Sequence, residues 1–239
     1  MPVKARPGFQ TNVDRTIKGT AKKSVYFDIA PGQTVLLRFT PSSRADGDLF
    51  FESSQHFKFT HGGEKRAFAC INIHKNEKAE ACPICEALEK AEELLDKAEV
   101  KKLNKAHRGS NRWHAQIVVV PAEGAEKPTM SNVIGLSQTT AQKIARILKR
   151  QKDMGQPLLN DVDNGEIISI ERIGTGFDTE YDVQSTGVRV PLDKVFPGWE
   201  EKFLDVEKAL KLRVEDRATL IESLSETFGP AVFGKLGVK

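Results

Sequence analysis

The sequence is short of several features that mark common protein classes. It has three cysteines, two tryptophans and two tyrosines in 239 residues. An odd number of cysteines with no signal-peptide pattern argues against a disulfide-stapled secreted domain. No apolar run approaches the length of a membrane-spanning helix, so we expect a soluble chain with no membrane partner. The net charge is only +3, so the overall charge balance does not identify a partner.

Catalytic signatures are also missing from the sequence. The histidines lie near cysteines or basic runs, and no glycine-rich phosphate loop precedes a helix. The stretch Gly174-Thr175-Gly176 lies inside an expected β-hairpin, which is the wrong context for a nucleotide-binding fingerprint. The sequence therefore predicts a binding protein and not an enzyme.

The chain does contain a compact group of metal-ligand residues. Cys70, Cys82 and Cys85 fall within a window of 16 residues. Tetrahedral zinc coordination needs one more ligand, which must be a histidine because no cysteine remains. Four protein ligands leave no open coordination position, so we expect one structural Zn²⁺. The candidates for the fourth ligand are His56, His61 and His74.

A thiol oxidoreductase is the competing interpretation of Cys82-Pro83-Ile84-Cys85. The motif opens an expected helix, as redox C-x-x-C pairs do. The redox fold, however, requires a buried strand directly before the motif, whereas residues 74–81 are highly charged. The spacing therefore favours a metal site and keeps the redox pair as an alternative.

Positive charge gathers in two segments of the chain. Residues 1–23 carry six cations against one acid, and we expect them to form a flexible basic arm. The second segment, residues 97–112, leads into a strand that begins with Trp113. Single-stranded nucleic acid is held by cations along its phosphates and by aromatic faces under its bases. The nucleic-acid contacts expected here are Lys101, Lys102, Lys105, Arg108, Arg112 and Trp113, although a strand tryptophan can equally be a packing residue.

Two further places combine cations with aromatic rings. One is an expected hairpin that carries Arg172, Phe177 and Tyr181. The other is the stretch around Phe57 and Phe59, with Lys65 and Arg66 in the next strand. Residues two apart on a strand share a face, so we expect both phenylalanines to lie in the core.

Hydrophobic patterns predict a mostly β chain with inserted and C-terminal helices (α+β). Short strands are expected within 24–72, 113–120 and 166–192, and helices at 83–103, 139–154 and in two pieces from 199 onward. Strands that turn back at short intervals favour a small Greek-key barrel or a sandwich. An OB-fold barrel with an inserted structural zinc subdomain is the economical solution. The predicted divisions are the arm at 1–23, an OB-fold core at 24–196 with the zinc subdomain inserted at about 56–108, and a helical C-terminal segment at 197–239.

Several of these pieces occur together in one known family. His56 is followed by Cys70, by Cys82-Pro83-Ile84-Cys85 opening a helix, by a basic stretch that leads into 113–120, and by the hairpin at 170–183. Over roughly residues 24–190 the chain resembles the single-stranded DNA-binding (helix-destabilising) replication proteins of T-even-like phages. That resemblance implies an OB fold, His56 as the fourth zinc ligand, and DNA contacts by Arg112, Trp113, Phe177 and Tyr181.

The resemblance also implies a biological role. Such a protein coats and protects single-stranded DNA in replication, recombination and repair, largely without regard to sequence, in the cytoplasm of the phage's bacterial host. Its basic N-terminal arm would mediate self-association along DNA. Replication proteins are implied partners, although residues 229–239 do not match the acidic, partner-recruiting tail of the family. A zinc-dependent RNA-binding or transcription-associated factor is the alternative.

Overall fold

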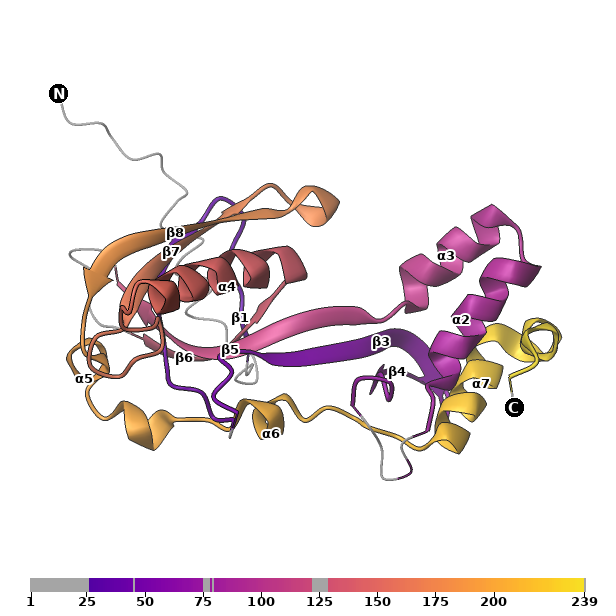
Figure 1. The fold of residues 1–239 in the computed structure, drawn as a ribbon. Coiled ribbons are helices and arrows are strands. Elements are labelled where there is room, and N and C mark those ends of the chain that lie inside the picture. The colour runs from indigo at the N-terminus through magenta and orange to yellow at the C-terminus, as the bar shows by residue number, and fades with distance from the viewer. Residues whose placement is uncertain (1–25, 45, 75–77, 79, 122–128, 239) are drawn as a thin grey trace.

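Figure 1 shows the computed structural model, which describes residues 26–44, 46–74, 78, 80–121 and 129–238. The expected basic arm at residues 1–23 lies outside these ranges, so its role stays a prediction. Among the helices that are described, none has both the length and the apolar character needed to cross a membrane.

The strands pair into one eight-stranded sheet. The main path runs β1-β6-β5-β2-β7-β8, and β3 pairs with both β5 and β4. Every pairing is antiparallel except that of β1 with β6. The strands are β1 (Tyr26–Phe27), β2 (Thr34–Phe39), β3 (Phe51–His61), β4 (Glu64–Ala69), β5 (Ser110–Val120), β6 (Thr129–Leu136), β7 (Glu166–Ile173) and β8 (Glu180–Arg189).

Helices make up a larger share of the chain than expected. Helix accounts for 38% and strand for 30%, so the protein is mixed α/β and not mostly β. The finer assignment to an OB-fold barrel stays a prediction. The helices are α2 (Pro83–Leu94), α3 (Lys97–His107), α4 (Gln138–Asp153), α5 (Leu192–Val195), α6 (Val206–Leu210) and α7 (Arg217–Leu236), with short 3₁₀ turns η1 (Gly176–Asp178) and η2 (Trp199–Lys202).

The single helix predicted over residues 83–103 is in fact two helices. Leu95 is extended and ends α2, and the next residue, Asp96, caps α3. The Asp96 carboxylate accepts hydrogen bonds from the backbone N–H groups of Ala98 and Glu99. Because an N-cap aspartate favours a helix start over helix continuation, the break follows from local chemistry.

Two hydrophobic cores organise the molecule. The first lies between the sheet and α4, and Leu37, Ile117 and Ile144 are fully buried in it. The second lies between α2, α7 and the β3–β4 hairpin. Figure 1 shows β3 and β5 as long strands that run from the first part of the molecule to the helices α2, α3 and α7. The C-terminal helix α7 therefore completes the part of the molecule that carries the cysteines.

A β-bulge changes the faces of β3 after His56. The register shifts between His56 and Phe59, and Lys58 adopts a positive φ of 63°. As a result Phe57 is 41% exposed, whereas Phe59 is fully buried. The prediction that Phe57 and Phe59 share a buried face was wrong, because an extra residue in a strand reverses the side-chain alternation.

Candidate metal centre and adjoining groove

The four predicted metal ligands lie together. The ligand atoms of His56, Cys70, Cys82 and Cys85 are all within 4.8 Å of one another. The His56 Nε2 atom is 3.5 Å from the Cys82 sulfur and 3.6 Å from the Cys85 sulfur. The Cys70 and Cys85 sulfurs are 3.6 Å apart. This cluster could hold one metal ion.

Each ligand is positioned by a different feature of the chain. His56 lies within β3, and Cys70 directly follows β4. Cys82 is the N-cap of α2 and Cys85 lies in its first turn, with Pro83 at the start of the helix. The backbone N–H of Cys82 donates to the Asn72 side chain at 2.8 Å. The positive end of the α2 dipole therefore lies at these two cysteines, where a metal-bound thiolate would carry negative charge.

The other two candidate histidines have separate roles. His61 is hydrogen-bonded through Nδ1 to the Ser223 hydroxyl at 3.0 Å. The Nε2 atom of His74 accepts a hydrogen bond from the backbone N–H of Ser54 at 3.1 Å, and the His74 ring stacks on Phe51. Neither belongs to the cluster, so His56 is the histidine that could complete a four-ligand site.

His56 is held in the orientation that a metal ligand needs. Its Nδ1 donates to the carbonyl oxygen of His107 at 3.0 Å, which leaves Nε2 directed at the sulfurs. A second hydrogen bond of this kind fixes the ring and its tautomer in metal sites. Burial acts to lower the pKa of His56, but hydrogen bonds to the Cys70 and Cys82 sulfurs outweigh it and raise the pKa to about 10.

The pKa values of Cys70 and Cys85 are shifted in opposite directions. Hydrogen bonds to Cys82 and Cys85 hold the pKa of Cys70 far below its usual value. Hydrogen bonds to Cys70 and, next in size, to Cys82 raise the pKa of Cys85 well above its usual value. Two thiolates side by side repel each other unless a cation lies between them. A divalent ion would remove this conflict, so the donor set suits a metal.

Gly109 leaves room for the His56 ring at the end of α3. A Cβ at Gly109 would lie 3.0 Å from the Ser54 hydroxyl and 3.3 Å from Cε1 of His56. We expect Gly109→Ala to displace the ring and to weaken metal affinity roughly tenfold, the lower end of effects seen for outer-shell changes. Competition with a chelating dye measures this. Gly234→Ala is the matched control, since nothing lies within 4 Å of a Cβ there; equal affinities for the two variants would contradict the prediction.

A groove of about 500 Å³ adjoins the metal centre. It extends from the ligands themselves to the start of β5 and the start of α4. Its lining brings together Arg108 and Trp113, which were predicted as nucleic-acid contacts. The full lining is Ser54, His56, Cys70, Asn72, Ile73, Cys85, Arg108, Gly109, Asn111, Trp113 and Gln138.

The other predicted contacts near the groove are mostly exposed cations. Lys101, Lys102 and Lys105 project from α3, and Arg112 is exposed on β5 next to Trp113. Trp113 is half-buried and packs in part against the first core. The structure therefore brings α3 and the N-terminal end of β5 to one side of the metal centre.

The remaining predicted contacts do not line the groove. Arg172 is half-buried and donates to the carbonyl of Ile29 at 2.8 Å. Lys65 donates to the Thr60 hydroxyl at 2.7 Å, and Arg66 pairs with Glu64 at 3.2 Å on the β3–β4 hairpin.

The hairpin aromatics lie apart from the groove lining as well. Tyr181 is half-buried at the start of β8 and packs against the first core. The backbone of Phe177 lies in η1, and its side chain is outside the described part of the structure.

Sequence reasoning missed the amide side chains of the groove. Asn72, Asn111 and Gln138 come from a turn, a strand and a helix start. Nothing in their local sequence marks them, because only the tertiary structure brings these segments together. Gln138 also shows that α4 begins at the groove, which the helix pattern alone did not reveal.

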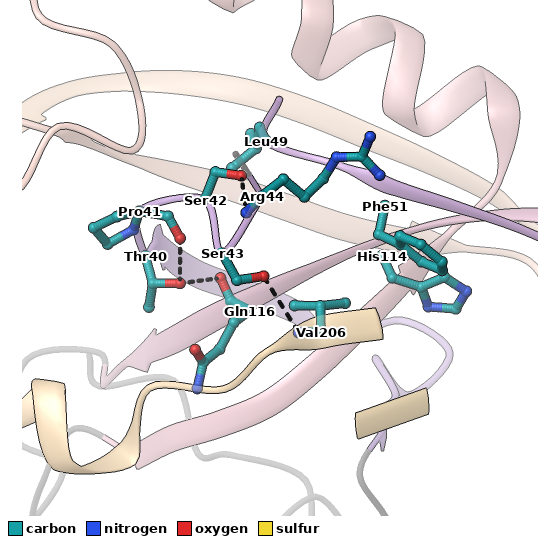
Figure 2. A pocket seen from close by; sticks show the side chains of 10 residues that line it. All are labelled: Thr40, Pro41, Ser42, Ser43, Arg44, Leu49, Phe51, His114, Gln116 and Val206. Atoms are coloured by element: carbon teal, nitrogen blue, oxygen red, sulfur yellow. Dashed lines mark hydrogen bonds between the residues drawn. The ribbon is translucent and has the colours of Figure 1, made fainter. Parts of the chain in front are cut away.

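A second hollow lies on the other side of β5, beneath the loop between β2 and β3 (Figure 2). The Ser43 hydroxyl accepts a hydrogen bond from the backbone N–H of Val206 there, and Thr40 is hydrogen-bonded to the carbonyl of Gln116. Its volume is only about 10 Å³. Such a space suits roughly one water molecule, so it is not a candidate ligand site.

Comparison with known families agrees with this geometry. No curated protein shows significant similarity to the chain. The family described as gp32 DNA binding protein like matches it over residues 32–223. The matched span covers most of the chain and includes the four cluster residues together with the groove. The predicted resemblance is confirmed: the chain belongs to the gp32 DNA binding protein like family.

Proposed function

We propose that the protein binds single-stranded DNA in the groove beside a structural Zn²⁺ centre. The observation that carries this proposal is the placement of Trp113 and Arg108 in one groove with the metal cluster. The groove combines an aromatic face with cations and amides, which are the groups that hold unpaired strands. Membership of a DNA-binding family supports the same conclusion.

The dimensions of the cluster support zinc. Zn–S bonds of about 2.3 Å and Zn–N bonds of about 2.0–2.1 Å in a tetrahedron place sulfurs roughly 3.8 Å apart and nitrogen roughly 3.6 Å from sulfur. The cluster has a sulfur–sulfur separation of 3.6 Å and nitrogen–sulfur separations of 3.5 and 3.6 Å. Three thiolates and one imidazole also suit zinc better than magnesium or calcium. Four protein ligands make the role structural, which favours this reading over a redox pair.

The zinc would act on DNA indirectly. His56 connects the centre to α3 through the His107 carbonyl, and Cys85 itself lines the groove. Holding α2, α3 and β3 together keeps Arg108 in the same groove as Trp113. Loss of the ion would therefore disorder one wall of the groove and weaken binding.

Different side chains would contact different parts of the DNA strand. Trp113 stacks on a base, which is worth roughly 1–3 kcal/mol per platform. Arg108 and Arg112 contact phosphates beside it, and Lys101, Lys102 and Lys105 add a basic wall on α3. Phe177 and Tyr181 of the β7–β8 hairpin are the proposed outer aromatic contacts. Lys65, Arg66 and Arg172 do not line the groove, so their contacts with DNA stay predictions.

The wider role follows the family resemblance. We propose an OB-fold, non-enzymatic protein that coats single strands in replication, recombination and repair in the bacterial host of a phage. Self-association through residues 1–23 and contacts with replication proteins belong to the same proposal.

The test combines metal analysis with DNA titration on one preparation. We expect one zinc per chain in protein purified without added metal, and binding of oligo(dT) that weakens with salt. The log–log salt slope should have a magnitude of about 0.7 for each phosphate neutralised. A strong preference for RNA of equal length would favour the RNA-binding alternative. The proposal would be overturned if the chain proved to be folded without metal and did not bind oligo(dT) at low salt.

A further inference from the structure

We propose that the outer face of α4 is a second nucleic-acid contact surface, which continues the path of the strand beyond the groove. This inference rests on the proposed single-strand binding. Its ligand is the phosphate backbone of the same strand that occupies the groove. The surface is defined by Lys143, Arg146, Lys149, Arg150 and Lys152, and it is called the α4 ridge below.

The charged residues of α4 are almost all positive. The helix carries five cations and a single acid, Asp153, in a chain whose net charge is only +3. All five cations are exposed. The opposite face is buried against the sheet through Ala141 and Ile144. Packing therefore fixes which face of α4 points outward, and that face is cationic.

The ridge cations have few protein partners. Among the described residues, none of the five takes part in an ion pair. Arg146 lies three residues before Lys149 and four before Arg150, so these like charges are neighbours on the helix surface. Such pairs destabilise an isolated helix, and a bound polyanion reverses the sign of that contribution.

The helix that carries the ridge begins at the groove. Gln138, the first residue of α4, lines the groove, and the helix runs from there over the sheet beside the β7–β8 hairpin (Figure 1). Near its start, Lys143 donates to the carbonyl of Tyr181 at 2.6 Å. From Gln138 to Arg150 the helix extends the path by about 18 Å. A strand leaving the groove along α4 would thus meet cations throughout.

A solvated charged face is the ordinary explanation for exposed lysines and arginines, and an acidic protein segment could also be attracted to them. Two observations favour a strand. Helix α4 begins at the groove, and the first cation of the ridge, Lys143, donates to the backbone carbonyl of Tyr181, a proposed base contact. A cationic surface unrelated to DNA binding would not be expected to lie next to both the groove and Tyr181.

The experiment compares the double variant Arg146→Gln/Lys149→Gln with wild-type protein on two DNA lengths. Oligo(dT) of about 6 nucleotides fits the groove alone, and oligo(dT) of about 16 nucleotides reaches the ridge. We expect roughly tenfold weaker binding of the long oligomer at low salt and a salt slope smaller in magnitude by about 1.4, from two lost phosphate contacts. Binding of the short oligomer should be unchanged. Lys194→Gln/Lys202→Gln, which removes one exposed cation from α5 and one from η2, is the matched control.

The outcomes separate this inference from the proposed function. Unchanged affinity of the ridge variant for the long oligomer overturns the inference while leaving groove binding intact. Equal losses with the control variant also overturn it, because they would reflect general charge and not a path. Equal losses on both lengths would place the two cations in the groove and exclude a separate surface. Failure of wild-type protein to bind either length would instead sink the proposed function. Thermal midpoints of all variants should match, since the substituted side chains are exposed.

Discussion

Replacing Cys85 with serine is expected to release the metal and to unfold the part of the molecule built on α2, α7 and the β3–β4 hairpin. The Cys85 sulfur is one of the four atoms that could coordinate the ion. The surrounding hydrophobic core includes two more of the cluster residues, Cys70 and Cys82. Loss of a structural metal ranks among the few changes that cost more than about 4–5 kcal/mol of unfolding free energy. DNA affinity should fall with it, because Cys85 also lines the groove.

The measurement is metal content per chain together with amide hydrogen exchange. We expect metal content to fall from one ion to near zero, and protection to be lost in 51–108 and 217–238. Protection of β2, β7 and residues 117–120 of β5 should persist, because these segments pair with one another and their core with α4 is separate. His61→Ala is the control for metal content, since His61 lies outside the cluster. If the Cys85 variant kept full protection in both regions, the metal would have no structural role.

The grouping of the four residues that could hold a metal was largely predictable from sequence, and the reason is chemical. Few ions suit three thiolates, and the spacing of Cys82 and Cys85 brings two of them together within one turn of the chain. The histidine was harder to choose because it comes from a strand. His56, His61 and His74 are all within reach by spacing, and only the β3–β4 pairing shows which of them faces the sulfurs.

The two errors in the secondary structure predicted from sequence have local causes. A bulge moved Phe57 out of the core, and no sequence pattern announced it, because Lys58 is not a residue that favours positive φ. The break between α2 and α3 did have a signal, since Asp96 is a good N-cap residue. The apolar stripe through Leu95 and Ala98 concealed it by continuing at helical spacing.

The groove and the second core could not be predicted, because both depend on contacts between distant segments. The α7 helix packs Leu220 and Leu224 against α2, more than a hundred residues earlier in the chain. Gln138 comes to line the groove because the preceding strand, β6, pairs with β5. Local patterns predict which residues are helical and which face is apolar, but not which elements meet.

Trp113→Ala is the second change with a large expected effect, and it acts on DNA binding with little effect on the fold. Trp113 lies near the start of β5, lines the groove and is only half-buried. Losing one stacking platform costs roughly 1–3 kcal/mol, which corresponds to about a 5- to 150-fold loss of affinity for oligo(dT). Fluorescence anisotropy with labelled oligo(dT) measures this, and the thermal midpoint reports the fold.

Two further variants decide whether stacking is the cause. Trp113→Phe keeps an aromatic face, so we expect it to recover most of the lost affinity. Trp199→Phe is the matched control, because Trp199 is buried beside Val118 in a separate cluster away from the groove. DNA-induced quenching of tryptophan fluorescence should persist in the Trp199 variant and disappear in Trp113→Phe. Should Trp113→Ala bind as tightly as wild type, or lose affinity only in proportion to lost stability, Trp113 would be a packing residue, and the base platform would have to lie elsewhere in the groove.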